Sequence, residues 1–203
     1  MTPRLVLFDL DDVLCHYDRP ARVAELATLA ARPVAEIEAA IWDSGFEDQA
    51  DRGAFTAENY LWEFGKRLGF WITREAWVEN RRRSMTPWPE MLALVERVKR
   101  HAKVALFTAN GPLLKAELAK VYPAVPELLG ADNLHFTCEV GHLKEEPQAF
   151  FKLLEKRGVS PFDTLFVDDR AENVAAAKLA GVRAHQFRAL GPLRDELAVM
   201  GLV

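Results

Sequence analysis

Residues 5 to 14 read Leu5-Val6-Leu7-Phe8-Asp9-Leu10-Asp11-Asp12-Val13-Leu14, an apolar run that ends in a cluster of aspartates. The consecutive apolar residues before the first carboxylate predict a strand buried on both faces, as strands of parallel sheets are. Val104 to Phe107 and Thr164 to Val167 have the same apolar character. Each of these later runs precedes a polar loop and a segment with helical periodicity. The repeated order of strand, loop and helix therefore predicts an α/β fold with a doubly wound, mainly parallel sheet.

Weaker patterns complete this predicted core. Leu134 to Thr137 and Val182 to Phe187 would bring the sheet to about five strands. Helices are predicted over Pro112 to Val121 and over Ala171 to Ala180, after the second and third strong strands. A further amphipathic helix is expected over Glu90 to Arg100.

A long insertion is expected between the first and second strong strands, because nearly a hundred residues separate them and one crossover helix needs far fewer. Helix start and end signals predict about four helices between residues 19 and 86. We therefore predict an α/β core of residues 1–15 and 87–203, with an inserted helical domain of residues 16–86. The two crossings, His16 to Arg19 and Met85 to Pro89, are expected to act as hinges. The helix signals are Pro20, Pro33, Gly45, Thr56, Gly69 and Thr73.

Most of the tryptophans of the chain fall within the predicted helical domain, namely Trp42, Trp62, Trp71 and Trp77. A small helical module needs bulky apolar side chains to build a core of its own. We therefore expect most of these tryptophans to be buried there.

The chain has 203 residues, a net charge of −4 and a pI near 5.8. This balance gives no basic field that could hold a nucleic-acid backbone, so no nucleic-acid partner is expected. The only dense basic cluster, Arg81-Arg82-Arg83, is expected to form an exposed helix face.

No apolar stretch approaches the roughly 20 residues of a membrane-spanning helix, and the N-terminal sequence does not resemble a signal peptide. Cys15 and Cys138 have neither a metal-ligand spacing nor a disulfide framework. They are predicted to be reduced thiols, although the sequence leaves a pairing between them open. The protein is therefore expected to be soluble and cytoplasmic, without a membrane partner, as a monomer or a homodimer.

Polar side chains end the three strong strands: Asp9 follows the first, Thr108 the second and Asp168 the third. Open α/β sheets bind their ligands outside the carboxyl ends of the strands, so these side chains are expected to meet. Two carboxylates in a dry cleft repel one another unless a cation neutralises them. Mg²⁺ suits such a site, because it binds carboxylates, water and phosphate oxygens. We therefore predict a magnesium site with Asp9, Asp11 and Asp168 as ligands.

Asp9 and Asp11 are the predicted catalytic residues. Asp9 is expected to attack phosphorus and form an aspartyl-phosphate. Asp11 suits a general acid that protonates the leaving oxygen and then takes a proton from water, with loop capping as its alternative role. Asp169 is predicted to bind a metal-bound water and Asn173 to hold the loop, with helix capping as the alternative for both.

Phosphate-binding groups are expected on two further segments. Thr108 and the amide of Ala109 can donate hydrogen bonds to the transferring phosphoryl group, and Lys144 can balance its charge. Asn110 is expected to orient either the substrate or Asp11.

Residues 9–14 resemble the first motif of the haloacid dehalogenase superfamily, Asp-x-Asp-Gly-Val/Thr-Leu. Thr108 stands at the second motif, Lys144 at the third and Asp168-Asp169 at the fourth, so the resemblance covers essentially the whole chain. The inserted helices, together with residues 144–150 and 166–173, are similar to a subgroup with helical caps. That subgroup includes sugar-phosphate phosphatases and the N-terminal phosphatase domain of soluble epoxide hydrolases. The resemblance implies a magnesium-dependent phosphatase that acts on a small phosphorylated metabolite.

Three alternatives to a phosphatase stay open. Dehalogenases of the superfamily usually lack the second aspartate, because a halide leaving group needs no proton, so Asp11 argues against this activity. A phosphomutase uses the same two aspartates. A catalytically silent binding or regulatory protein would explain two departures from the motifs. Asp12 replaces the usual glycine, and Glu145 replaces a proline, which is expected to loosen the loop that aims Lys144.

The sequence does not identify the leaving group of the substrate. Residues of the insertion and its connections that face the cleft should select it. The candidates, for which packing or surface positions are the alternative, are His16, Tyr17, Arg22, Phe46 and Trp88.

Overall fold

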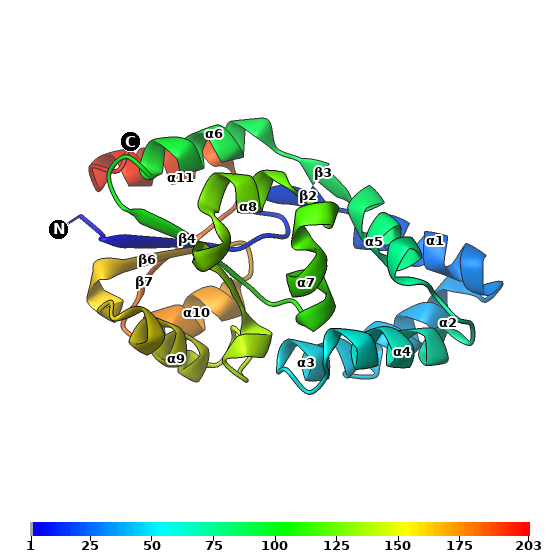
Figure 1. Cartoon of the computed structure of the whole chain (residues 1–203). Coiled ribbons are helices and arrows are strands. Elements are labelled where there is room, and N and C mark those ends of the chain that lie inside the picture. The colour runs from blue at the N-terminus through cyan, green and yellow to red at the C-terminus, as the bar shows by residue number, and fades with distance from the viewer. Residues whose placement is uncertain (1) are drawn as a thin grey trace.

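The computed structural model describes residues 2–203, and within them five parallel strands form one sheet in the order β5-β4-β1-β6-β7 (Figure 1). β1 pairs in parallel with β4 on one side and with β6 on the other. The predicted doubly wound α/β sheet is therefore confirmed, and the three strong apolar runs are its three central strands. The strands are β1 (Leu5–Phe8), β4 (Lys103–Thr108), β5 (Leu134–Phe136), β6 (Thr164–Asp168) and β7 (Arg183–Gln186).

Helices cover both faces of the sheet (Figure 1). Val6 and Phe8 of β1 belong to the core on one face, and Leu5 and Leu7 belong to the core on the other. All four side chains are fully buried, which explains why the run is apolar without alternation. The first face carries α6 (Pro89–Val98), α7 (Pro112–Val121), α8 (Ala124–Leu129) and α11 (Leu190–Val199), and the second carries α9 (Pro147–Arg157) and α10 (Ala171–Leu179).

A helical insertion, residues 19–83, lies beyond the carboxyl ends of the strands (Figure 1). Its two connections to the core, β2 (Cys15–Tyr17) and β3 (Met85–Pro87), pair as an antiparallel ribbon. The two predicted hinge segments therefore run side by side, held by backbone hydrogen bonds. The insertion contains α1 (Arg19–Ala30), α2 (Val34–Glu38), the π-helical turn η1 (Ala39–Asp43), α3 (Phe46–Asp51), α4 (Ala57–Leu68) and α5 (Arg74–Arg83).

The described insertion has five α-helices and a π-helical turn, whereas the sequence signals predict about four helices. Pro33 begins a separate short helix, α2, because a proline is tolerated at a helix start and not in its interior. Gly45 has a φ of 73°, which interrupts the chain between η1 and α3 instead of ending the helical region. Thr56 and Thr73 cap α4 and α5 as predicted, by accepting hydrogen bonds from first-turn amides.

Phenylalanine and tyrosine rings, rather than most of the tryptophans, build the core of the insertion. Trp77 is buried, but Trp62 is 51% exposed and Trp71 is 70% exposed, so the expectation was wrong for these two. The buried face of α4 carries Tyr60 and Phe64, and Trp62 lies between them in sequence, on the opposite side of the helix. The clustered rings that replace the tryptophans are Phe46, Tyr60 and Phe64.

Cys15 and Cys138 are both free thiols, so the pairing that the sequence left open does not form. Burial raises the pKa of the Cys15 thiol and raises that of Cys138 to about 11, so both thiols are protonated at neutral pH. Among residues 2–203, no helix has the length and apolar character needed to cross a lipid bilayer.

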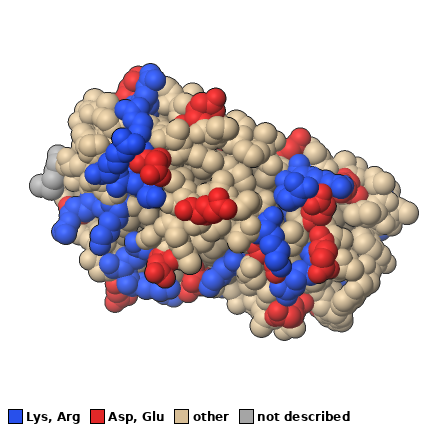
Figure 2. Space-filling model, turned by 45° about the horizontal axis from the view of Figure 1, so that its top comes forward, with Lys and Arg blue, Asp and Glu red and all other residues tan. Residues whose placement is uncertain are grey.

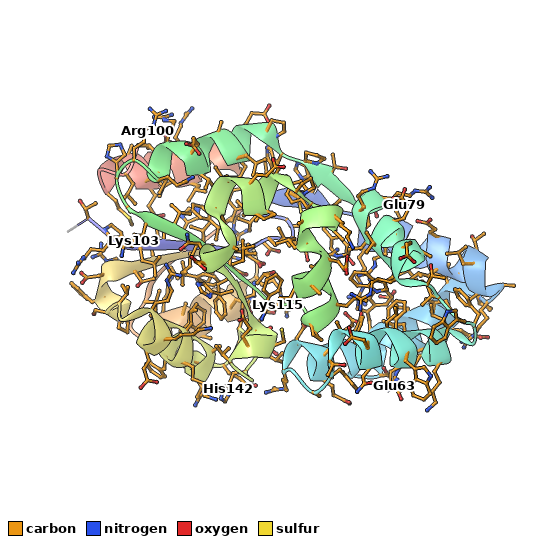
Figure 3. All side chains as sticks on the ribbon, in the orientation of Figure 1. Glu63, Glu79, Arg100, Lys103, Lys115 and His142 are labelled. Carbon is orange, nitrogen blue, oxygen red and sulfur yellow. The ribbon has the colours of Figure 1, made fainter. Side chains whose placement is uncertain are left out.

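Basic side chains gather at the end of the molecule remote from the helical insertion, whereas both signs of charge mix elsewhere on the face in Figure 2. A hollow of about 810 Å³ lies at that end, lined by Arg4 and Lys103 where β1 and β4 begin. Lys103 is labelled there in Figure 3. Because this hollow is at the amino ends of the strands, the motif residues do not line it.

Candidate active site

A cavity of about 600 Å³ lies between the carboxyl ends of the central strands and the helical insertion. It brings together side chains that are far apart in the sequence, from both the core and the insertion. The core contributes Asp9, Asp11, Asp12, Thr108, Ala109, Asn110, Lys144, Asp169, Arg170 and Asn173, and the insertion with its β2 connection contributes Tyr17, Arg19, Pro20, Arg22, Trp42, Glu47, Asp48, Asp51 and Arg81.

Asp9 stands at the bottom of this cavity, directly after β1. Its backbone N–H donates to the Val167 carbonyl at 3.0 Å, which continues the pairing of β1 with β6. The Lys144 ammonium lies 2.7 Å from Asp9 Oδ1 and 2.6 Å from Asp168 Oδ2, so it bridges the two carboxylates. Burial raises the pKa of Asp9 to about 7, although Lys144 acts in the opposite direction. The site is therefore crowded with negative charge that one lysine only partly compensates.

Lys144 is held firmly even though Glu145 follows it in place of a proline. Its side chain is buried, and the charges of Asp168 and Asp9 raise its pKa despite burial, which alone would lower it. The loop is held from Glu146, which pairs with Arg52 of the insertion and with His142 of the same loop. These ion pairs tie the loop to the insertion and to itself, without the proline of the family motif.

Asp168 and Asp169 have different surroundings. Asp168 is fully buried, and its two oxygens accept hydrogen bonds from the Arg170 amide at 2.9 Å, from Asn173 Nδ2 at 2.9 and 3.1 Å, and from Lys144. Asp169 is only partly buried and lines the cavity, which Asp168 does not. Asn173 therefore donates to the Asp168 carboxylate; its predicted roles were to hold the loop or to cap the helix.

Oxygen atoms of Asp9, Asp168 and Asp169 all lie within 4.8 Å of one another, a spacing that a single cation can span. Three acidic oxygens with no nitrogen or sulfur donor suit a hard ion such as Mg²⁺. Because the oxygens of Asp168 already accept hydrogen bonds, Asp169 is better placed to offer one to a cation in the cavity. The sequence analysis predicted Asp168 as the metal ligand and Asp169 as the partner of a metal-bound water, whereas Asp169 is the one of the two that lines the cavity.

Thr108, Asn110 and Asp11 form a hydrogen-bonded chain in the lining of the cavity. Asn110 Nδ2 donates to Thr108 Oγ1 at 2.8 Å and to Asp11 Oδ2 at 3.3 Å. Asn110 therefore orients Asp11, which is one of the two roles expected for it.

Arg81 is a residue of this site that the sequence analysis missed. It is 1% exposed, and its Nη2 atom lies 2.7 Å from Asp11 Oδ1 and 2.6 Å from Asp11 Oδ2. The expectation of an exposed basic face was wrong for Arg81 and correct for Arg82 and Arg83, which pair with Glu79 on the outer side of α5 (Figure 3). The signal was present, because Arg81 lies one helical turn after the buried Trp77 and so shares its face.

Asp12 adopts the left-handed conformation that the usual glycine would take, with a φ of 58°. Its Oδ1 atom accepts a hydrogen bond from the backbone N–H of Tyr17 at 3.0 Å. This bond joins the motif loop to β2 and offsets part of the conformational cost. Asp12 therefore has a local structural function that is compatible with an intact site.

The candidate substrate-contact residues divide into two groups. Tyr17 and Arg22 line the cavity, and the Tyr17 hydroxyl accepts a hydrogen bond from Arg22 Nη1 at 3.2 Å. Phe46 is fully buried, and His16 stacks on Trp88 at a centroid distance of 4.1 Å, outside the cavity lining. Phe46 is therefore a packing residue, Trp88 is partly buried, and His16 is an exposed residue of β2.

The insertion also contributes acidic and aromatic groups that the sequence did not single out. Trp42 reaches the cavity from the π-helical turn η1, a distortion often found at functional sites. Glu47 and Asp51 of α3 line the same wall, and burial raises the pKa of both. The part of the lining that comes from the insertion therefore carries carboxyl groups, which donate or accept hydrogen bonds according to their protonation, together with the Arg22 guanidinium, which donates.

A family model for hydrolases, the haloacid dehalogenase-like hydrolases, matches residues 3–181. The match spans most of the chain, and the protein therefore belongs to this family, as the four motifs implied. The members of this family are hydrolases, so the protein is an enzyme of this class. The α/β sheet and the cavity at the carboxyl ends of its strands agree with this assignment.

Two curated relatives carry phosphatase names. The chain is 27% identical to Phosphatase MT3486 of Mycobacterium tuberculosis, over 96% of this chain and 92% of the relative. It is 23% identical to D-ribitol-5-phosphate phosphatase of Bacteroides thetaiotaomicron, over 96% of this chain and 97% of the relative. A crystal structure of a HAD family enzyme from Bacteroides thetaiotaomicron, in complex with magnesium and inorganic phosphate, has the same fold. Its TM-score is 0.79 at 18% identity, with 94% of this chain and 98% of that chain covered.

Proposed function

We propose that this protein is a magnesium-dependent phosphatase that hydrolyses a phosphate monoester of a small metabolite through an aspartyl-phosphate on Asp9. The observation that carries the proposal is the ion-paired cluster of Asp9, Lys144 and Asp168 beside a cavity that Asp9, Asp11 and Lys144 line. The similarity to named phosphatases supports the same reaction class.

Magnesium would be held by the carboxylates of Asp9 and Asp169, with the backbone carbonyl of Asp11 as a further oxygen donor. When bound, the cation would neutralise the carboxylates and the phosphate oxygens and so allow an anionic nucleophile to approach phosphorus. Asp168, which does not line the cavity, would hold the Lys144 ammonium beside Asp9 by accepting its hydrogen bond.

The reaction divides into two displacements at phosphorus. In the first, an Asp9 carboxylate oxygen forms a bond to phosphorus while the bond to the leaving oxygen breaks, and Asp11 gives that oxygen a proton. In the second, Asp11 takes a proton from water, whose oxygen displaces Asp9 and releases inorganic phosphate. Thr108, the Ala109 amide and Lys144 stabilise the charge on the equatorial oxygens in both steps.

The leaving group would be a small polar metabolite, because the wall formed by the insertion is rich in hydrogen-bonding side chains. We further propose that residues 16–86 form a cap over a core of residues 1–15 and 87–203, and that this cap selects the leaving group. The similarity to a D-ribitol-5-phosphate phosphatase makes polyol and sugar phosphates the first compounds to test.

The test is the replacement of the nucleophile. Asp9→Asn keeps the shape of the side chain but cannot form a stable acyl-phosphate, so turnover of p-nitrophenyl phosphate in the presence of magnesium should fall below detection. Asp132→Asn changes an exposed aspartate of the turn η2 (Ala131–Asn133), away from the cavity, and should leave turnover unchanged. Phosphate release by Asp9→Asn at the wild-type rate would overturn the proposal.

A panel of phosphorylated metabolites would then define the substrate. Release of inorganic phosphate identifies a phosphatase, whereas conversion of a sugar phosphate to its isomer without phosphate release would identify a mutase. The wild-type protein and Asp9→Asn should be compared on every compound that reacts.

A further inference from the structure

Arg81 is the point at which the helical insertion touches the acid–base residue of the core. Arg81 lies in the last turn of α5, three residues before Ser84, and Ser84 Oγ donates to the Arg81 carbonyl at 2.7 Å. From there its guanidinium reaches Asp11, with Nη2 at 2.7 and 2.6 Å from the two carboxylate oxygens. The contact joins residues that are 70 positions apart in the sequence.

The surroundings of Arg81 show that this contact is built into the fold. A buried guanidinium is costly unless a carboxylate and further groups surround it, and Arg81 is 1% exposed. The Tyr17 ring lies under it, with the guanidinium carbon 4.0 Å from the ring centroid. Among residues 2–203, Asp11 is the carboxylate that forms an ion pair with Arg81.

Asp11 depends on this contact for its orientation. Its side chain is 22% exposed, and it follows β1, where its backbone forms an isolated bridge with Cys15 and the Cys15 thiol lies 4.0 Å from Asp11 Oδ1. Two side-chain nitrogens donate to it: Arg81 Nη2 from the insertion and Asn110 Nδ2 from the core, the latter at 3.3 Å. The shorter and charged contact comes from the insertion, so it contributes more to the position of the carboxylate.

We propose that Arg81 is a positioning residue, which fixes the Asp11 carboxylate when the insertion lies against the core. Proton transfer between Asp11 and the leaving oxygen, or the attacking water, then requires the docked insertion. This inference rests on the proposed phosphatase function. It assigns to the insertion a part in catalysis that is separate from contact with the leaving group.

The basicity of the leaving group provides a specific readout of the first displacement. A p-nitrophenolate leaving group departs without a proton, whereas an alkoxide leaving group needs one from Asp11. A residue that acts through Asp11 should therefore matter more for an alkyl phosphate than for p-nitrophenyl phosphate. A residue that only supports the fold should affect both esters equally.

The experiment compares kcat and KM for the two esters in wild type, Arg81→Gln, Arg81→Lys, Asp11→Asn and the double variant Asp11→Asn/Arg81→Gln. kcat/KM reports the first displacement, whereas kcat also includes the second, which is the same for both esters. Arg81→Gln should lower kcat/KM for the alkyl phosphate about tenfold more than for p-nitrophenyl phosphate, with the same pattern as Asp11→Asn. In the Asp11→Asn background, Arg81→Gln should cost no more than about twofold further. Arg81→Lys should recover part of the loss, because it keeps a donor and a charge.

Arg82→Gln is the matched control, because Arg82 is the next residue of α5, is exposed and pairs with Glu79 on the outer side of the helix. It should leave both esters unaffected. Thermal unfolding checks that each variant is folded. If Arg81→Gln is unfolded, the comparison of the two esters is made with Arg81→Lys instead.

Three results would overturn the inference: equal losses of kcat/KM on both esters, a rise in KM with kcat unchanged for both esters, or losses that multiply fully in the double variant. A rise in KM alone would instead make Arg81 a ligand of the substrate. If the wild-type protein hydrolyses neither ester nor any metabolite phosphate, the proposed function itself fails, and that outcome is distinct from a failure of the role of Arg81.

Discussion

Asp168 and Asp169 are adjacent in the chain, yet their carboxylates do different things. The Asp168 carboxylate is buried and accepts hydrogen bonds from Lys144 and Asn173, so it fixes the position of the Lys144 ammonium. The Asp169 carboxylate reaches the cavity, and burial together with the charge of Asp168 raises its pKa. A nearby cation would reverse that effect, as expected of a metal ligand.

Replacing each aspartate by asparagine separates the two roles. Asp169→Asn should raise the magnesium concentration for half-maximal activity about tenfold or more, with little change in the unfolding temperature. Asp168→Asn should lower the free energy of unfolding by about 2 kcal/mol, because the buried Lys144 loses one of its two carboxylate partners. Magnesium titrations of activity and thermal melts would measure both effects, and the reverse pattern would return the metal-ligand role to Asp168.

At the scale of elements, α3 and the loop that follows it form a contact between the insertion and the core. The loop after α3 approaches the short helix η3 (Thr137–Glu139) so closely that a Cβ atom on Gly53 would lie 2.4 Å from the Cys138 carbonyl oxygen. Arg52, the residue before it, pairs with Glu146 in the loop of Lys144. Docking of the insertion and placement of Lys144 are therefore linked through the same short segment.

Gly53→Ala should disturb this docking. Gly53 and Gly45 both have positive φ, of 80° and 73°, so an alanine costs about 1 kcal/mol of conformational strain at either position. At Gly45 a Cβ atom would meet nothing within 4 Å, which makes Gly45→Ala the matched control. Gly53→Ala should lower stability further and reduce phosphatase activity, as measured by chemical denaturation and kinetics. Equal effects of the two substitutions would show that the contact with Cys138 is unimportant.

At the scale of the whole molecule, the cavity concentrates carboxyl groups between the core and the insertion. Burial raises the pKa of Asp9 to about 7 and also raises the pKa values of Glu47 and Asp51. The folded protein therefore holds protons that the unfolded chain has already released. By linkage, the free energy of unfolding without metal should decrease as the pH rises from about 4 to about 7.

Magnesium should counteract this loss, because the cation binds the ionised form of Asp9. The increase in unfolding temperature on replacing EDTA by magnesium should be larger at about pH 8 than at about pH 5. In Asp9→Asn both the pH dependence and the effect of magnesium should be smaller. A magnesium effect that is independent of pH would contradict this account of the site.

The core of the fold and most of its site could be predicted because they depend on local sequence. Apolar runs such as Leu5 to Phe8 can be satisfied only by burial on both faces, and the side chains that follow parallel strands meet at one edge of the sheet. Asp9, Thr108 and Asp168 were therefore placed correctly at the carboxyl ends of the central strands. The motif spacing then added Lys144 and Asn173.

The tertiary structure alone decided which side chains face the cavity. Arg81 is buried while Arg82 and Arg83 are exposed, and Asp169 reaches the cavity while Asp168 lies behind it. These differences depend on how the insertion docks and how each loop turns, which involve contacts between residues far apart in the chain. The sequence by itself determined the sheet, the family and the chemistry of the strand ends, because these follow from local patterns. The partners of Asp11 and Lys144 follow from packing between the core and the insertion, which no local pattern records.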